Sequence, residues 1–409
     1  MATSAAGQFL RAGARRLGRS DDAPASRPTR LAVVGLLMTV SAINIMVSAQ
    51  EVLKGNFAHD YRYNFLAGRI GLASGWARIY SLPLQQHEWA HSWSDWFPFT
   101  PFINPPPVAW VGAPLVTLPW TTARVLWMIG VGLLALLTVL LAAPATWRHR
   151  LGYGLLAVAF TPVLGVVRDG QVIVLVAAGI VLGVRLIESG HEVLSGFAFS
   201  LIGVKPHVAM MVPIALAVAG HWRAIVALLG TSVAWVGASL LSVGASGVHD
   251  YIGLLHWAAI FQTPRQRSLM WLAGSGPAVA GLEAMAMVAV VAAMLSLRRH
   301  RLRVVLSVAV VGSLMVSPYV NAGDLSLLLL PLWLVFDGRW SALASVGAAL
   351  VGTVEILEFW PRLVPLVELL AVVAFVTAAS QTSLRSARAT ERVPPDRARV
   401  ADGAPGRKG

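Results

Sequence analysis

The chain has 409 residues, of which 56% are hydrophobic and 12% charged, and its mean hydropathy is +0.69. A soluble globular domain carries about 25% charged residues, so this composition excludes an ordinary soluble protein. The formal net charge of +13 is compatible with nucleic-acid binding, but in so apolar a chain it more simply reflects Arg-rich loops beside a membrane.

The apolar residues fall in runs of about 17 to 25, the length needed for a helix to cross a bilayer. These runs do not alternate as the strands of a membrane barrel do. They predict an all-α polytopic membrane protein, here a bundle of about 10–14 transmembrane or re-entrant helices. The chain has no cysteine, which excludes disulfides and thiol chemistry.

The chain divides into a membrane domain between two polar tails. Residues 1–30 and 380–409 are basic and are expected to be disordered cytoplasmic tails, and 31–379 form the membrane domain. The first span is expected at 31–49. Further spans are expected at 121–143, 151–167, 171–187, 224–243, 276–297, 302–320, 323–336, 341–357 and 363–379.

Two apolar regions are interrupted by proline. Residues 105–119 and 193–219 each predict a re-entrant or broken helix pair rather than one straight span. If each returns to the side from which it came, roughly two thirds of the 32 basic residues lie on the cytoplasmic side. This bias predicts ten full spans with both termini on the cytoplasmic side, and it puts a large first loop, about 50–120, on the outer face. The Ala-, Arg- and Gly-rich composition is typical of a bacterium, so the expected location is the bacterial plasma membrane.

The outer loop begins with "NFAHDYRYNF", which contains the carboxylate Asp60 close to the first span. On a helix, Tyr63 and Asn64 share its face at i+3 and i+4. Asp60 is either an interfacial carboxylate solvated beside Arg62 or a partly desolvated general base for a hydroxyl nucleophile. Tyr61, Tyr63 and Asn64 are candidate substrate contacts.

Residues 87–107 are rich in aromatic side chains, among them Trp96. They form either an aromatic belt at the membrane surface or a platform for a sugar or an isoprenoid chain. His87, His91 and Asp95 have a spacing that could bind metal, but nothing supplies a further ligand, and no metal is expected.

Lys205 lies in the middle of an apolar run, in "LIGVKPHVAM". A charge at that depth costs about 3 kcal/mol on insertion scales, so it is either a snorkelling lysine or a functional one. Because Pro206 breaks the helix there, we interpret Lys205 as a phosphate-binding cation, with His207 as a second donor.

Three further outer segments hold polar residues. They are Arg168 and Gln171 in "VVRDGQVIV", Arg265 and Arg267 in "FQTPRQRSL", and Tyr319 and Asp324 in "SPYVNAGDLSL". Each is either an ordinary solvated turn or part of a site, with Arg265 and Arg267 as phosphate ligands and the others as substrate contacts.

The ordered set of these motifs resembles glycosyltransferase family eighty-seven, a GT-C-type group of polyprenol-phosphate-sugar-dependent mannosyl- and arabinofuranosyltransferases. The motifs are "DYRY" (60–63), "ASGWARIY" (73–80), "FPFTPFINPPPVAWVGAPLVTLPW" (97–120), "RDGQ" (168–171), "GFAFSLIGVKPH" (196–207) and "SPYVNAGDLSLLLLPL" (317–332). The resemblance implies that Asp60 is the catalytic base and that Lys205-Pro206 is the family's Lys-Pro at the broken helix.

The resemblance also implies a membrane glycosyltransferase of cell-envelope glycolipid synthesis. Its donor is a polyprenyl-phosphate-linked sugar, mannose or a relative, and its acceptor is a glycolipid or glycan at the outer face. Inversion follows from a single displacement, and no cofactor, metal or nucleic acid is required.

Two alternatives stay open. A transporter or flippase for an amphiphilic lipid would use Glu283, Glu355 and Lys205 as relay groups. A scaffold without enzymatic activity would depend on no single polar residue. Neither the sugar, the acceptor nor the oligomeric state follows from the sequence.

Overall fold

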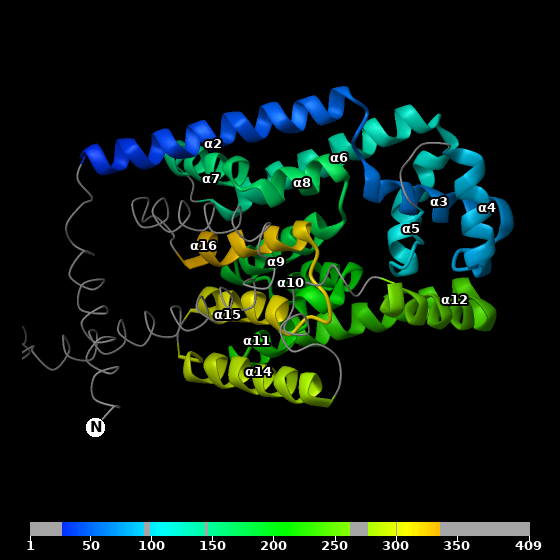
Figure 1. Ribbon diagram of the computed structural model, residues 1–409. Coiled ribbons are helices and arrows are strands. Elements are labelled where there is room, and N and C mark those ends of the chain that lie inside the picture. The colour runs from blue at the N-terminus through cyan, green and yellow to red at the C-terminus, as the bar shows by residue number, and fades with distance from the viewer. Residues whose placement is uncertain (1–26, 94–98, 144–145, 262–276, 300, 336–409) are drawn as a thin grey trace, which may run out of the picture.

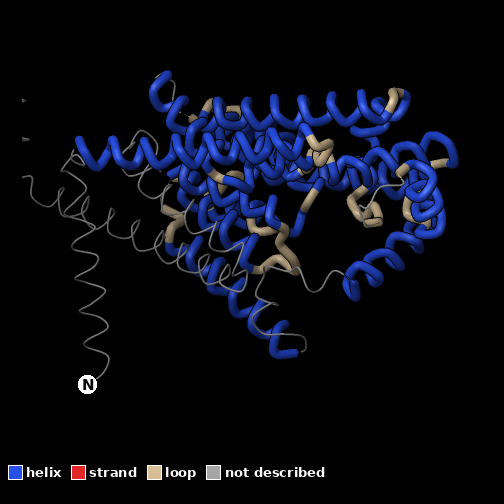
Figure 2. Tube along the Cα trace, turned by 45° about the horizontal axis from the view of Figure 1, so that its top comes forward, coloured by secondary structure: helices blue, strands red, loops and turns tan. Residues whose placement is uncertain are grey.

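The computed structural model describes residues 27–93, 99–143, 146–261, 277–299 and 301–335. Within these ranges every regular element is a helix, and loops join them without a strand (Figure 2). The prediction of an all-α protein is therefore confirmed for this part of the chain.

The first half of the described chain contains α2 (Arg27–Leu53), α3 (His59–Ser74), η1 (Trp76–Arg78), α4 (Leu82–Ser92), α5 (Pro106–Gly112), η2 (Ala113–Thr117), α6 (Trp120–Ala142), α7 (Trp147–Ala159) and α8 (Thr161–Asp169), where η marks a 3₁₀ turn. The second half contains α9 (Ile173–Glu188), α10 (Glu192–Phe199), η3 (Ser200–Val204), η4 (Pro206–Ala209), α11 (Val212–Val218), α12 (Trp222–Phe261), α14 (Pro277–Ser296), α15 (Leu302–Met315), η6 (Ala322–Leu328) and α16 (Leu329–Val335).

Three of these helices are long and apolar enough to cross a membrane: Leu31–Leu53 in α2, Trp120–Ala142 in α6 and Trp222–Ala258 in α12. They coincide with the expected spans at 31–49, 121–143 and 224–243. The helix Trp222–Ala258 is bent at Gly244, whose φ of 62° and ψ of −174° interrupt the helical conformation. The ten-span count and the orientation of the chain stay predictions.

The expectation of one straight span at 151–167 was wrong. This stretch forms α7 and α8, which meet at an angle of 75°. Phe160 has an extended backbone between them, and Pro162 lies in the first turn of α8, where its missing N–H is not needed. The two helices together could form a broken span.

The remaining expected elements fall where the apolar runs indicated. Regions 105–119 and 193–219 are broken helices, α5 with η2 and α10 through α11, as the prolines predicted. Runs 171–187, 276–297, 302–320 and 323–336 contain α9, α14, α15 and η6 with α16. None of these helices is by itself long and apolar enough to cross a membrane, so full spans at these positions stay predictions. The expected spans at 341–357 and 363–379, and both tails, lie outside the described residues.

The expected outer loop is mostly helical. Helices α3, α4 and α5 lie together at the end of the molecule where α2 finishes (Figure 1). Helix α3 packs on α6 through aromatic rings: Tyr61 stacks on Trp127 with ring centroids 4.5 Å apart, and Phe65 meets Trp120 edge to face at 5.2 Å. Large buried rings contribute much of the burial energy that holds so short a group of helices in place.

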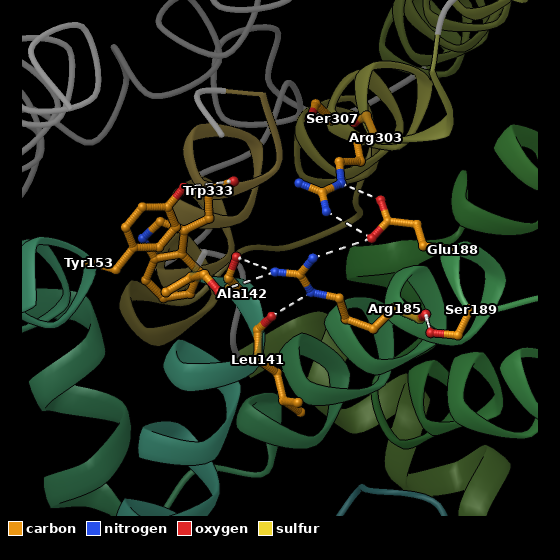
Figure 3. A network of polar contacts seen from close by, with 10 residues as sticks. Leu141, Ala142, Tyr153, Arg185, Glu188, Ser189, Arg303, Ser307 and Trp333 are labelled. Carbon is orange, nitrogen blue, oxygen red and sulfur yellow. Dashed lines mark hydrogen bonds and ion pairs between the residues drawn. The ribbon is translucent and has the colours of Figure 1, made fainter. Parts of the chain in front are cut away.

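Arg185 joins three helices through one polar network (Figure 3). Its guanidinium donates to the carbonyls of Leu141, Ala142 and Ala143, at the end of α6, at 2.6, 3.1 and 3.2 Å. Glu188 accepts from Arg185 at 3.3 Å and from Arg303 of α15 at 2.5 and 2.8 Å. The arginine thereby satisfies carbonyls that a helix end leaves without partners and adds a favourable charge at the negative end of the helix dipole.

Candidate active site

Asp60 is the second residue of α3, and a strained backbone precedes it. Ala58, fully buried, has φ 57° and ψ 35°, the left-handed conformation that residues with a side chain seldom adopt. Its N–H donates to the carbonyl of Arg168 at 2.7 Å. This bond ties the start of α3 to the end of α8, so that Asp60 lies near Asp169.

Asp60 is partly exposed as a whole residue, and its carboxylate has no hydrogen bond or ion pair with any described residue. Burial is the main cause that raises its pKa to about 7. The negative charges of Asp169 and Asp324 also raise the pKa, while Lys205 opposes them. Four charged groups from separate parts of the chain therefore converge, and the unpaired one titrates where a general base is useful.

Lys205 forms an ion pair with Asp324, Nζ to Oδ1 at 2.5 Å. The lysine lies between η3 and η4 with φ −148° and ψ 69°, a non-helical conformation that the following Pro206 favours. Its side chain is 12% exposed and that of Asp324 is 0% exposed. The two residues are 119 positions apart, so sequence reasoning, which named both, missed their pairing.

Asp324 is held from a second direction by the start of η6. Its Oδ2 accepts the N–H of Asn321 at 2.9 Å, and the Asn321 side chain accepts the N–H of Asp324 in return. This reciprocal capping box fixes the carboxylate on its own turn. With both oxygens engaged and no exposed surface, Asp324 is placed to act on Lys205 rather than to touch a ligand directly.

His207 and Tyr319 lie beside Lys205 and Asp324, which with Asp60 and Asp169 form the charged constellation of the site. Their ring centroids are 4.2 Å apart, and His207 lies close enough to Lys205 and Asp324 to sense both charges. Its Nε2 is buried and has no hydrogen-bond partner among the residues that the structure describes. Both rings are partly exposed, as expected for ligand contacts.

Arg168 and Gln171 flank a tight turn that faces η6. Arg168 donates to both oxygens of Asp169, at 2.9 and 3.2 Å, and Gly170 supplies the left-handed turn with φ 71°. The Gln171 side chain lies directly against Gly323, where an added Cβ would be 1.8 Å from Oε1. The sequence places Asp169 at the same turn as Arg168 and Gln171 but gives it no role, whereas in the structure its negative charge adds to the burial that raises the pKa of Asp60.

The candidate contacts beside Asp60 on α3 divide into two kinds. Burial and then the nearby negative charge of Asp60 raise the pKa of the Tyr63 hydroxyl, and the Tyr63 ring stacks on Trp89 with centroids 6.0 Å apart. Tyr61 is fully buried between Trp120 and Trp127, and Asn64 is buried and accepts a hydrogen bond from Asn104 at 3.3 Å. Tyr61 and Asn64 are therefore buried and support α3 from within the core, and Tyr61 packs beside Gly170.

Trp96, Arg265, Arg267 and Asp95 lie outside the described residues. His87 and His91 are exposed on α4. No group of three His, Cys, Asp or Glu side chains suited to a metal occurs in the part of the chain that the structure describes.

Comparison with known proteins identifies the family. The model of glycosyltransferase family 87 matches residues 102–318, just over half of the chain. The chain belongs to glycosyltransferase family 87. Arg168, Gln171, Lys205 and His207 of this glycosyltransferase lie inside the matched segment, whereas Asp60 precedes it. No curated protein and no solved structure matches the chain.

Family membership and the long apolar helices together make this a membrane glycosyltransferase. The resemblance noted from motifs is confirmed at the level of the family.

Proposed function

We propose that this family 87 glycosyltransferase transfers mannose, or a related hexose or pentose, from a polyprenyl-phosphate donor to a lipid-linked or envelope glycan acceptor at the outer membrane face. Asp60 is the general base. The observation that carries the proposal is a single carboxylate, unpaired within the described chain and with a pKa of about 7, beside the charge of Lys205.

The reaction is one displacement with inversion. The acceptor hydroxyl oxygen attacks the anomeric carbon, and its proton passes to the Asp60 carboxylate. The bond between the anomeric carbon and the phosphate oxygen breaks, and its electron pair stays on the polyprenyl phosphate. Asp60 loses one negative charge while the phosphate gains one, so the total charge of the site is unchanged.

The donor phosphate lies at Lys205 and His207 in this proposal, with Arg265 and Arg267 as further ligands. A cation beside the leaving oxygen stabilises the charge that develops in the transition state. Arg168, Gln171, Tyr63 and Tyr319 are the proposed sugar and acceptor contacts, because their side chains keep exposed surface around Asp60 and Lys205. Trp96, in the aromatic segment 87–107, is a further proposed substrate contact.

The test is transfer by the purified protein of labelled mannose from polyprenyl-phosphate-mannose to a glycolipid acceptor. Asp60→Asn preserves the size of the side chain and removes the base, so transfer should fall by about 10²- to 10⁴-fold. Asp250→Asn, a carboxylate on α12 outside the constellation, serves as the matched control and should transfer at the wild-type rate. Wild-type transfer by Asp60→Asn would exclude Asp60 as the base.

The transporter alternative is separated by reconstitution in liposomes. A flippase would move a labelled lipid-linked sugar between leaflets without an acceptor, and Asp60→Asn would leave that movement intact. Transfer that requires an acceptor and Asp60 would favour the glycosyltransferase mechanism.

A further inference from the structure

Lys205, the proposed phosphate ligand, already has an anion. Its ammonium is 2.5 Å from Asp324 Oδ1, and Asp324 is held by its own capping box through Oδ2. A paired cation attracts a phosphate less strongly than a free one, so the ion pair must affect how tightly the ligand is bound.

Resting on the function proposed above, we propose that Asp324 is a built-in competitor of the donor phosphate for Lys205, and that it drives release of the polyprenyl phosphate product. Asp324 acts through Lys205 and is a positioning residue.

The asymmetry of exposure favours this role. Asp324 is 0% exposed and both its oxygens are engaged, so it stays in place, whereas the Lys205 side chain keeps 12% of its surface exposed. An ammonium has three N–H donors, so a phosphate can contact Lys205 while Asp324 remains bound, and the two anions then compete for the same positive charge. The buried, unpartnered Nε2 of His207 offers a second polar contact beside the same pair.

The negative charge of the ligand increases during the reaction, so Asp324 repels the product more strongly than the donor. A sugar phosphodiester carries one negative charge, whereas the polyprenyl phosphate that leaves carries nearly two at neutral pH. Repulsion by Asp324 is therefore about twice as large for product as for donor. The buried carboxylate weakens binding of both ligands but weakens that of the product more.

The test compares donor and product affinity in Asp324→Asn. Removing one charge several ångströms away should lower the KM for donor by about 10-fold and the inhibition constant of farnesyl phosphate, a short polyprenyl monophosphate, by about 100-fold. Turnover should fall because product leaves more slowly. Asp324→Glu, which keeps the charge, should restore the wild-type ratio of the two constants.

Two further measurements separate this role from simple structural support. A structural loss would lower the rate without changing the ratio of product to donor affinity, and that result would overturn the proposal. Lys205→Met combined with Asp324→Asn removes both charges, so product binding should no longer be tighter than in the wild type. Gain of tight product binding in this double variant would also overturn it.

The inference can fail separately from the proposed function. Thermal stabilisation by farnesyl phosphate is measured in detergent without any turnover, and it should be larger for Asp324→Asn than for the wild type. An equal or smaller stabilisation refutes the competition even if sugar transfer is observed. An absence of transfer by the wild type refutes the function instead.

Discussion

Asp60→Asn should make the protein more stable as well as less active. A carboxyl whose pKa is raised from 3.8 to about 7 by burial and by neighbouring negative charges is held ionised at a cost when the pH is high. Asparagine has nearly the same shape and no charge, so it removes this cost. Stability gained where activity is lost is the pattern expected of a residue kept for function.

The size of the effect follows from proton linkage. Between pH 3.8 and about 7 the folded protein keeps a proton on Asp60 that the unfolded chain has lost, so wild-type stability falls as pH rises through this window. Above it, the full difference is roughly 4 kcal/mol, because each pKa unit corresponds to about 1.4 kcal/mol. The advantage of Asp60→Asn should be about that large at pH 8, under about 2 kcal/mol at pH 5, and close to zero below pH 3.8.

The assay is thermal unfolding of wild type, Asp60→Asn and Asp250→Asn in one detergent at several pH values. The gap between wild type and Asp60→Asn should widen from pH 5 to pH 8, and Asp250→Asn should not show this trend. A gap that is constant with pH, or a variant that is less stable throughout, would show that the Asp60 carboxylate is not held in the desolvated, negatively charged surroundings described above.

Further predictions concern the wild-type pH profile, two residues that support the site and one that supports the fold. Transfer by the wild type should fall below pH 7 with a slope of one, because the base must be ionised, and this limb should be absent from the residual activity of Asp60→Asn. Ala58→Gly should raise stability by up to about 1 kcal/mol, measured by thermal unfolding, because glycine adopts positive φ without strain. The transfer rate of Ala58→Gly should fall if the left-handed backbone at Ala58 holds Asp60 in its orientation. An unchanged rate would show that this backbone conformation does not orient Asp60. Gly323→Ala should displace the Gln171 side chain and raise the KM for substrate with little loss of stability, and an unaltered KM would place Gln171 away from the ligand. Arg185→Leu should lower stability by about 1–3 kcal/mol without a change in substrate KM, because it leaves the carbonyls at the end of α6 unpaired, and wild-type stability would refute its capping role.

The sequence was informative where a polar residue interrupts an apolar run. Lys205 was identifiable because a charge is costly within an apolar run, and Pro206 marked the break in the helix. Asp60 was identifiable from its place just after the first span and from its match to the family's motif. The bend between α7 and α8 was not predicted, although Pro162 lies there. A proline within an apolar run can also occur in a membrane helix that is only kinked, so its presence did not reveal a bend of 75°. Helices α3 and α4 of the outer loop were not predicted as elements because their hydrophobic periodicity is weak and the packing of α3 depends on aromatic contacts with the distant α6.

Pairings were beyond the reach of the sequence. Nothing in "GVKPH" or "NAGDL" indicates that their charges meet across 119 residues, and Asp169 had no signal that distinguished it from a solvated turn residue.

In the proposed mechanism, the ion pairs around Asp60 determine its basicity more than the residue types alone do. Asp324 neutralises Lys205, and Arg168 neutralises Asp169, which leaves Asp60 as the one carboxylate of the described constellation without a cation of its own. An ion pair to Asp60 would lower its pKa and weaken it as a base, whereas two nearby carboxylates with their own partners raise it. A glycosyl transfer that adds negative charge to the leaving phosphate would raise the Asp60 pKa further as the bond breaks, so proton uptake by Asp60 becomes more favourable as the leaving group departs.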